Sequence, residues 1–208
     1  QADCISTMTY NEYWQVIDAG IPAEDLVVFK YEDQGVATLE DGLRFLAEGP
    51  ATIAAGCTDL FPATESRALT GRVLDVTGIG ALRRIDTGPR TIRIGAGVTW
   101  SQLIAAALPP GFDMLKAAAR EVGSVQIQNA GTLAGNLCNA SPAADGVPCL
   151  LALDAGVELR GPGGARVLAL TDCIAGPRRT ARQPGEIVTA ILVPRASAGG
   201  ASRFLKLG

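Results

Sequence analysis

The sequence predicts a mixed fold of α-helices and β-strands, in which a small β-α-β-type lobe precedes a larger, strand-rich part. Three observations support this prediction. Short apolar runs alternate with segments of helical periodicity, glycine–proline pairs separate several of them, and the last third contains two strand-like runs joined by a glycine-rich turn. A length of 208 residues is sufficient for one large domain or two small lobes with a real hydrophobic core.

Residues 1–27 are expected to form an N-terminal arm or linker, because Gly20-Ile21-Pro22 would interrupt a helix there. The small lobe is expected over residues 28–80. Thr38 is a typical N-cap for its helix, and Gly49-Pro50 would end that helix. The expected elements are a strand at Leu26–Tyr31, a helix at Leu39–Ala47, and strands at Ala51–Ala55 and Arg72–Val76.

The larger part is expected over residues 81–208. Its helices should be short, since Pro109-Pro110-Gly111 interrupts the helical pattern. The last strand-like run reaches the end of the sequence, so we expect the chain to be cut within that element. The expected elements are a strand at Thr91–Val98, helices at Trp100–Leu108 and Met114–Val122, an apolar run at Val147–Leu153, a hairpin of Gly156–Leu159 with Val167–Leu170, and strands at Gly185–Pro194 and Arg203–Gly208.

Charge and hydropathy argue against several classes of partner. The net charge is −3 and the pI is near 5.0, and no basic stripe suggests a nucleic acid or an anionic membrane as a partner. The sequence contains neither an apolar run of transmembrane length nor a segment that resembles a signal peptide. We therefore expect a cytoplasmic protein.

The chain contains no histidine, which excludes a Ser-His-Asp triad, a Cys-His pair and most zinc sites. Its five cysteines are scattered and none has CxxC spacing, so no metal or iron–sulfur site is expected within the chain. No catalytic side chain stands out. If the protein performs redox chemistry, a bound cofactor must supply it.

Residues 128–145 are the stretch most suggestive of a ligand site. They show neither the period of an amphipathic helix nor the alternation of a strand. Two glycines allow close approach of the backbone, and successive N–H groups can form an anion-binding nest. Hydroxyl and amide groups come from Thr132, Asn136, Asn139 and Ser141. An extended, phosphate-bearing ligand would suit this segment, although an ordinary loop whose asparagines bond their own backbone is about equally consistent with it.

A second candidate contact is the junction at Gly56, where a strand of small residues opens into a loop. Backbone amides beside Gly56 and Thr58 are available for a phosphate. The alternative is a plain β-to-α turn in which Asp59 caps the next segment. Two further sequences, at residues 78–80 and 95–97, read Gly-x-Gly, but both lack the third glycine and the distant acidic residue of a dinucleotide-binding Rossmann motif.

These segments together resemble one family, the FAD-binding subunits or domains of the molybdenum hydroxylases, which include xanthine dehydrogenase and carbon monoxide dehydrogenase relatives. Residues 55–60 resemble the family's AGGTDL loop, residues 95–100 its GAGVTW segment, and residues 125–145 its VxxIRNxATxGGNxxxASPxxD motif. The ordered set covers about residues 28–208. The third motif is more similar to the xanthine dehydrogenase side of the family.

The resemblance implies an α+β, two-lobed FAD-binding fold of the kind shared by vanillyl-alcohol oxidase and UDP-N-acetylenolpyruvoylglucosamine reductase. FAD would lie extended between a lobe at 28–80 and a lobe at 81–208. By position, the residues around the pyrophosphate and adenosine half would be Ile53, Ala54, Ala55, Gly56, Cys57 and Thr58, with Asp59 beside them. From the other lobe, the pyrophosphate would contact Thr132, Gly135 and Asn136. The flavin side would contact Asn139 and Ser141, the ligand's hydroxyls Asp145, the isoalloxazine ring Val188, and the edge of that ring Lys206.

The sequence departs from the family pattern at several positions. Cys57 and Ala134 each replace a glycine, and Gln128 stands where arginine is usual. Each of the first two changes adds a Cβ atom where the resemblance implies a close backbone approach. The family's small C-terminal domain, which would follow Lys206, is missing from this sequence.

The function implied by the resemblance is that of an FAD-dependent oxidoreductase subunit. It would pass electrons from [2Fe–2S] clusters through FAD to NAD or another acceptor, as part of a complex with a molybdopterin-binding subunit and a [2Fe–2S] subunit or domain. Two alternatives stay open. One is a non-catalytic nucleotide-binding or scaffold subunit that has lost the flavin, and the other is a stand-alone flavin oxidase.

Overall fold

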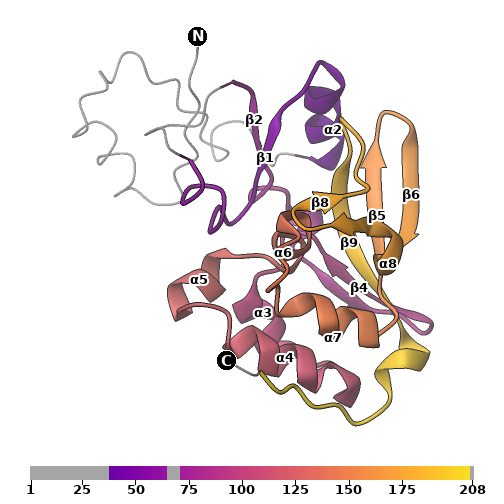
Figure 1. The fold of residues 1–208 in the computed structure, drawn as a ribbon. Coiled ribbons are helices and arrows are strands. Elements are labelled where there is room, and N and C mark those ends of the chain that lie inside the picture. Colours follow the sequence, from indigo (N-terminus) through magenta and orange to yellow (C-terminus); the bar gives the residue numbers. More distant parts are fainter. Residues whose placement is uncertain (1–37, 65–70, 207–208) are drawn as a thin grey trace.

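The computed structural model describes residues 38–64 and 71–206 (Figure 1). The predicted N-terminal arm and the strand predicted at Leu26–Tyr31 therefore lie outside the described residues. The described chain combines helices with three separate sheets, which confirms the predicted mixture of helix and strand.

The small N-terminal part contains α2 (Leu39–Ala47), β1 (Thr52–Ala54) and β2 (Val73–Asp75). Helix α2 begins with a capping box, because the hydroxyl of Thr38 accepts from the N–H of Asp41 at 3.2 Å and Asp41 accepts in return from the N–H of Thr38 at 3.3 Å. Gly49, with φ +154°, follows the helix. Strands β1 and β2 pair in parallel. The predicted helix and both predicted strands are confirmed.

The larger part is built on a five-stranded antiparallel sheet in the order β3-β4-β9-β5-β6. Its central strand β9 pairs with β4 on one side and β5 on the other, which explains why nearly all of its residues are buried. The predicted hairpin is β5 with β6, and it is confirmed. The strands are β3 (Ile85–Thr87), β4 (Thr91–Gly95), β5 (Gly156–Gly161), β6 (Gly164–Ala169) and β9 (Ile187–Pro194).

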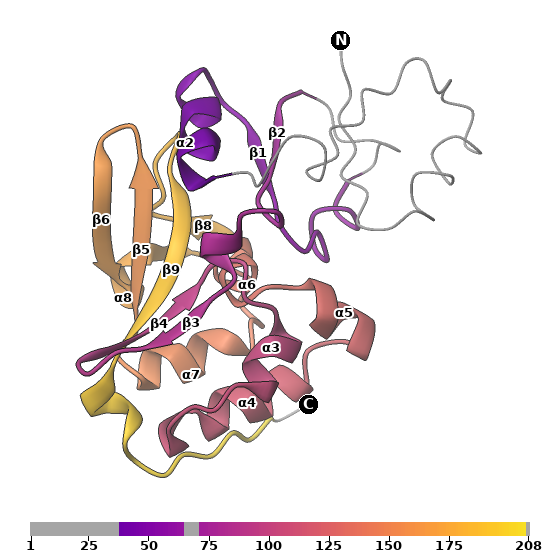
Figure 2. The same cartoon turned by 180° about the vertical axis from the view of Figure 1, so that it is seen from behind.

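Helices α3 (Trp100–Ala105), α4 (Asp113–Arg120) and α7 (Gly146–Ala152) gather on one side of this sheet (Figures 1 and 2). Together with the sheet they form the main hydrophobic core, in which Phe112 and Leu150 are completely buried. The remaining elements are η2 (Gly80–Leu82), η3 (Pro110–Phe112), α5 (Val125–Ala130), α6 (Leu133–Asn139), α8 (Leu170–Cys173), β7 (Ile174–Gly176), β8 (Arg179–Thr180) and η4 (Arg195–Ala198).

The structure corrects the description of residues 128–145, which were expected to show no regular structure. The stretch contains the end of α5 and the whole of α6, and it stops at Asp145, the N-cap of α7. Helices α5 and α6 have six and seven residues, so neither is long enough to display a clear apolar stripe in the sequence. Both begin instead at capping hydroxyls, those of Ser124 and Thr132.

The predicted last strand is also wrong for its described residues, 203–206, which form no strand. The chain runs along α4 instead (Figure 1). Ser202 fastens it there, because its hydroxyl accepts from the N–H of Met114 at 3.0 Å and donates to the carbonyl of Pro110 at 3.0 Å. The hydrogen bonds of Ser202 therefore connect this tail to the beginning of α4 and not to a neighbouring strand. The helix predicted at Trp100–Leu108 ends earlier, at Ala105.

The described residues contain two separate hydrophobic clusters. The smaller one packs α2 against β1 and β2, and it also includes Leu82 and Ile187 from the larger part. The larger one joins the five-stranded sheet to the helices beneath it. A division into lobes near residue 80 stays a prediction, and Ile187, on the central strand of the sheet, connects the two parts.

A partly buried ion pair fixes the segment that leads into β9. The guanidinium of Arg166 binds both carboxylate oxygens of Glu186, at 2.6 and 2.8 Å, and the N–H of Gln183 donates to the same carboxylate at 2.6 Å. Glu186 is only 8% exposed. The hydrogen bond from Arg166 is the main reason that the pKa of Glu186 lies below its usual value.

We expect Glu186→Gln to lower the free energy of unfolding by about 1–3 kcal/mol at pH 7. Because the folded-state pKa is lowered, the stabilisation is complete above the unfolded-state value of about 4.3 and is lost as the pH falls through the folded-state value. The difference between wild type and variant, measured by urea unfolding, should therefore shrink below about pH 4.3. Glu40→Gln removes an exposed carboxylate 3.9 Å from Arg160 and serves as a control with little expected effect. A difference that stayed constant down to pH 2 would contradict this account.

Candidate functional site

The two loops singled out in the sequence meet in the structure. A Cβ atom built on Gly56 would lie 1.9 Å from the carbonyl oxygen of Ala130 and 2.8 Å from the Cα of Gly131. The Cβ position of Gly131 is in turn 3.2 Å from the hydroxyl of Thr58. Only glycine permits so close an approach of two backbones. The loop after β1 and the α5–α6 junction therefore form one continuous surface.

An isolated antiparallel bridge between Thr99 and Thr132 holds the second loop in place. Two backbone hydrogen bonds flank the bridge, from the N–H of Trp100 to Gly131 at 3.1 Å and from the N–H of Leu133 to Val98 at 3.2 Å. Each threonine is also an N-cap, Thr99 for α3 and Thr132 for α6. The GAGVTW segment thus contributes to the candidate site by positioning α6, a role that the sequence did not indicate.

Gly135 lies in the first turn of α6 and does not have a positive φ. Its N–H donates to the hydroxyl of Thr132 at 2.9 Å, and a Cβ atom on Gly135 would lie 2.8 Å from that hydroxyl. The neighbouring Ala134 is 3% exposed and belongs to the main core. The methyl group of Ala134, a departure from the family pattern, is therefore accommodated in the core.

The carboxamide oxygen of Asn136 is buried and has no hydrogen-bond partner among the described residues. It lies beside Gly146, where a Cβ atom would be 3.0 Å from this oxygen and 2.9 Å from the ring of Trp100. A buried oxygen without a donor is costly, because it has lost its water and gained nothing in exchange. Such an atom indicates that a ligand or an ordered water completes the site.

The C-terminal end of α6 carries Asn139, followed by Ala140 in a left-handed conformation with φ 45°. The guanidinium of Arg178 donates to the carboxamide oxygen of Asn139. Ser141 forms a turn in which its hydroxyl accepts from the N–H of Ala143 at 3.3 Å. Arg178 was missed by sequence reasoning, because nothing in the pattern of residues 176–179 distinguishes it from an ordinary turn residue.

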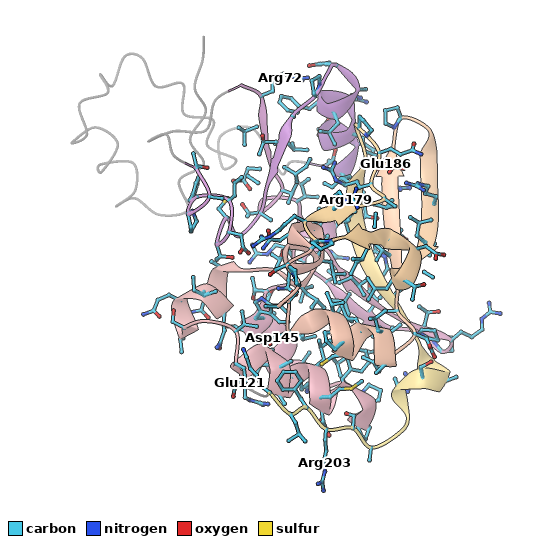
Figure 3. All side chains as sticks on the ribbon, in the orientation of Figure 1. Arg72, Glu121, Asp145, Arg179, Glu186 and Arg203 are labelled. Atoms are coloured by element: carbon cyan, nitrogen blue, oxygen red, sulfur yellow. The ribbon has the colours of Figure 1, made fainter. Side chains whose placement is uncertain are left out.

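Asp145 and Lys206 form an ion pair, with the ammonium group 2.9 Å from Oδ2 of the carboxylate. Asp145 immediately precedes α7 (Figure 3), whereas Lys206 comes from the tail that runs along α4. The side chain of Asp145 is 18% exposed and that of Lys206 is 47% exposed. The two residues were predicted to contact different parts of the ligand, and the structure brings them together.

Three other predicted residues are buried or packed in a hydrophobic cluster, and a fourth, Asp59, is exposed. Ala54 is completely buried in β1, and Ile53 packs in the smaller cluster, so only their backbone atoms are available to a ligand. Val188 is 6% exposed, pairs with Leu159 and belongs to the main core. Asp59 is exposed, and its backbone carbonyl accepts from the N–H of Ala63 at 3.2 Å. Their roles at a cofactor stay predictions.

Two of the departures from the family pattern have clear structural consequences. Cys57 has φ 53°, a left-handed conformation that favours glycine, so the cysteine strains the loop where the family has glycine. Gln128 binds the end of α4, because its amide donates to the carbonyls of Arg120 and Val122, both at 3.1 Å. Gln128 therefore connects α4 with α5.

Two surface hollows lie away from these loops. One, of about 310 Å³, is next to the β5–β6 turn and is lined in part by Gly163 and Gln183. The other, of about 260 Å³, is near Thr91 and Leu168. Neither contains a residue predicted to bind the ligand, and we assign the site from the loop contacts instead. Within residues 38–64 and 71–206, no helix is long and apolar enough to cross a membrane.

Comparison with known proteins shows the family to which the chain is similar. Residues 30–196 match the family model described as the FAD binding domain in molybdopterin dehydrogenase. The chain is 38% identical over 178 residues to the nicotinate dehydrogenase FAD-subunit of Eubacterium barkeri, covering 82% of this chain and 60% of that protein. It is 34% identical over 159 residues to the carbon monoxide dehydrogenase medium chain of Afipia carboxidovorans, covering 74% of this chain and 54% of that protein.

A solved structure shows the same similarity. Reconstituted CO dehydrogenase from Oligotropha carboxidovorans superposes with a TM-score of 0.70 at 32% sequence identity, covering 76% of this chain and 56% of that chain. The chain thus spans between about half and three-fifths of the length of these relatives.

Proposed function

The chain belongs to the family of FAD binding domains in molybdopterin dehydrogenases, and from this membership we propose that it is the FAD-binding electron-transfer module of a molybdenum-containing hydroxylase or dehydrogenase. The observation that carries the proposal is the contact of Gly56 with the backbone of Ala130 and Gly131. Two loops with the composition of phosphate-binding segments, from distant parts of the chain, are joined there without intervening side chains.

The residues at this junction fit FAD. The glycine contact brings the backbones of the two loops together, and glycine-rich loops of this kind bind phosphate through backbone N–H groups. No donor from the described part of the chain reaches the buried oxygen of Asn136, and hydroxyl groups of a nucleotide are donors. We assign Gly56 and Thr58 to one side of the pyrophosphate and Gly135 and Asn136 to the other. Asn139 and Ser141 would lie toward the flavin. Asp145, predicted at the ligand's hydroxyls, is proposed to lie near the flavin end as well, because it pairs with Lys206.

The protein's own contribution is to bind, orient and tune the cofactor. Bound FAD would supply the two-electron and one-electron chemistry that the side chains of this chain lack. Asp145 and Lys206 place one negative and one positive charge beside the proposed flavin end. These charges set the electrostatic cost of adding electrons to the ring. No side chain needs to act as a nucleophile or a general base.

We extend the proposal to the fold type and to the complex. The two hydrophobic clusters support a two-lobed FAD-binding fold of the vanillyl-alcohol oxidase type, with FAD between the lobes. The partners would be a molybdopterin-binding subunit and a [2Fe–2S] subunit or domain, and NAD or another acceptor would take the electrons. Asn136 and Ser141 of the third motif favour a xanthine dehydrogenase-like complex. We place this complex in the cytoplasm.

The proposal is tested by titrating the apo-protein with FAD and with FMN while the flavin fluorescence is recorded. FAD should bind one per chain and much more tightly than FMN, because FMN lacks the pyrophosphate and adenosine that both loops would contact. Equal affinities would contradict the assignment of the loops. A folded protein that binds neither flavin would favour the alternative of a scaffold subunit that has lost its cofactor.

We expect Lys206→Met to lower the reduction potential of bound FAD and Asp145→Asn to raise it. The ammonium group stabilises the negative charge that develops on reduction, whereas the carboxylate opposes it. Each shift should be about 20–30 mV, since the two charges partly compensate each other and are near solvent. Redox titration with a reference dye measures both shifts. Shifts in the same direction in the two variants would show that the ion pair acts on the fold and not on the flavin.

A further inference from the structure

A two-residue turn brings Arg178 to the C-terminal end of α6. It connects β7 to β8, and α6 ends at Asn139 (Figure 1). The backbone N–H of Arg178 donates to the carbonyl of Ala140 at 2.8 Å, and its guanidinium donates to the carboxamide oxygen of Asn139. The turn is therefore attached to the end of α6 by one main-chain and one side-chain hydrogen bond.

The backbone at this contact is held in an unfavourable conformation. Arg178 has φ 57° and Ala140 has φ 45°, a region that residues with a Cβ atom rarely adopt. Of the four non-glycine residues with positive φ in the described chain, three belong to the proposed site or its rim: Cys57, Ala140 and Arg178. Strained residues of this kind gather where the surrounding structure must hold a functional geometry.

The contact determines which way the carboxamide of Asn139 points. A guanidinium group can only donate hydrogen bonds, so the oxygen of Asn139 faces Arg178 and its NH₂ group faces away. Asn139 is only partly buried, and it lies between the proposed pyrophosphate contacts of α6 and Ser141. Its NH₂ group is thus the part of the side chain that remains for a ligand.

We propose that Arg178 is a positioning residue of the flavin site, which fixes Asn139 so that the carboxamide NH₂ group donates to an acceptor atom of the bound flavin. The inference rests on the proposed function, since it takes the ligand beside Asn139 to be the flavin ring. Ring nitrogens and carbonyl oxygens of a flavin are acceptors, and a carboxamide turned the other way would oppose them with its own oxygen. Arg178 acts through Asn139 and needs no contact with the flavin itself.

The next residue, Arg179, provides a matched control. It is an exposed arginine on the same hairpin, and its guanidinium lies over the hairpin itself, 3.1 Å from the Cβ position of Gly176 (Figure 3). Arg178→Gly removes the guanidinium but keeps the N–H that binds Ala140, and glycine suits φ 57°. The variant should therefore melt no lower than wild type, which separates a positioning role from a structural one.

The test measures the dissociation constant of FAD by fluorescence titration for wild type, Arg178→Gly, Asn139→Ala, the double variant and Arg179→Ala. We expect the constant to rise roughly tenfold in each of the first two variants, as for loss of one oriented hydrogen bond. The double variant should be no weaker than Asn139→Ala alone, because both changes remove the same contact. Arg178→Lys, which keeps a donor, should retain most of the affinity, and Arg179→Ala should bind like wild type.

Each other outcome has a separate meaning. An unchanged dissociation constant in Arg178→Gly, or additive losses in the double variant, would overturn the positioning role. If Arg179→Ala lost as much affinity for FAD as Arg178→Gly, the effect would come from the net charge of the hairpin. That result would also overturn the positioning role of Arg178. If the wild-type protein binds no FAD, the proposed function fails, and the inference fails with it.

Discussion

Gly56→Ala is expected to weaken FAD binding and to destabilise the protein. The added methyl group would lie 1.9 Å from the carbonyl oxygen and 2.4 Å from the carbonyl carbon of Ala130, which are backbone atoms and cannot rotate away. The two loops must separate, and the proposed pyrophosphate site separates with them. Overpacking of this kind costs about 1–3 kcal/mol of stability. A similar loss in binding energy would raise the dissociation constant of FAD by roughly 5- to 150-fold.

The measurement combines flavin titration with thermal unfolding of the apo-protein. Gly80→Ala is the matched control, because no atom lies within 4 Å of its Cβ position and it comes from the same part of the chain. The control should bind FAD like wild type and should be slightly more stable, since alanine restricts the unfolded chain more than glycine does. Full FAD binding by Gly56→Ala would show that the contact with Ala130 is not part of the site.

Gly135→Val is expected to leave the protein folded and to lower its affinity for FAD about a hundredfold or more. The first side-chain carbon would lie 2.8 Å from the hydroxyl of Thr132, which caps α6 through the N–H of residue 135. Loss of the cap costs about 0.5–2 kcal/mol, and the branched side chain would occupy the proposed pyrophosphate position. Because Gly135 has a helical backbone without positive φ, the effect should come from this space and not from backbone strain.

Flavin content per folded chain, with circular dichroism as the test of folding, measures this effect. Gly42→Ala and Gly135→Ala both replace a helical glycine by alanine. Comparing their affinities for FAD therefore separates an effect of position 135 from the general effect of such a replacement. The nearest atoms to the Cβ position of Gly42 are methyl groups of Ile79 and Leu74 at 3.5 Å, an ordinary contact. Gly42→Ala should therefore keep full affinity. A folded Gly135→Val protein saturated with FAD would remove Gly135 from the proposed site.

Local signals in the sequence predicted most of the regular elements. Thr38 as the N-cap and Gly49-Pro50 as the helix end predicted α2, and the structure adds that Thr38 and Asp41 form a capping box. The apolar run within residues 185–194 predicted β9, and the glycine-rich turn predicted the β5–β6 hairpin. The same local reasoning was wrong for the last strand, because Ser202 attaches that tail to α4 through contacts distant in sequence.

The two loops of the candidate site could be identified from the sequence, but their geometry could not. Small residues and glycines marked both loops as places where backbone approaches a ligand. The short helices α5 and α6 were missed, since a helix of six or seven residues shows no period that a pattern can reveal. The N-caps Ser124 and Thr132 were the only local signal for them.

The sequence by itself determined that the protein has a mixed fold, lacks histidine chemistry, and carries the loops typical of an FAD-binding domain. Only the tertiary structure decided that Gly56 touches Ala130, that Lys206 pairs with Asp145 across 61 positions, and that Arg178 reaches Asn139 across 39. The physical reason is the range of the interactions. Caps, turns and alternation act within a few residues, whereas these contacts arise only when the sheet and its helices pack and bring distant segments together.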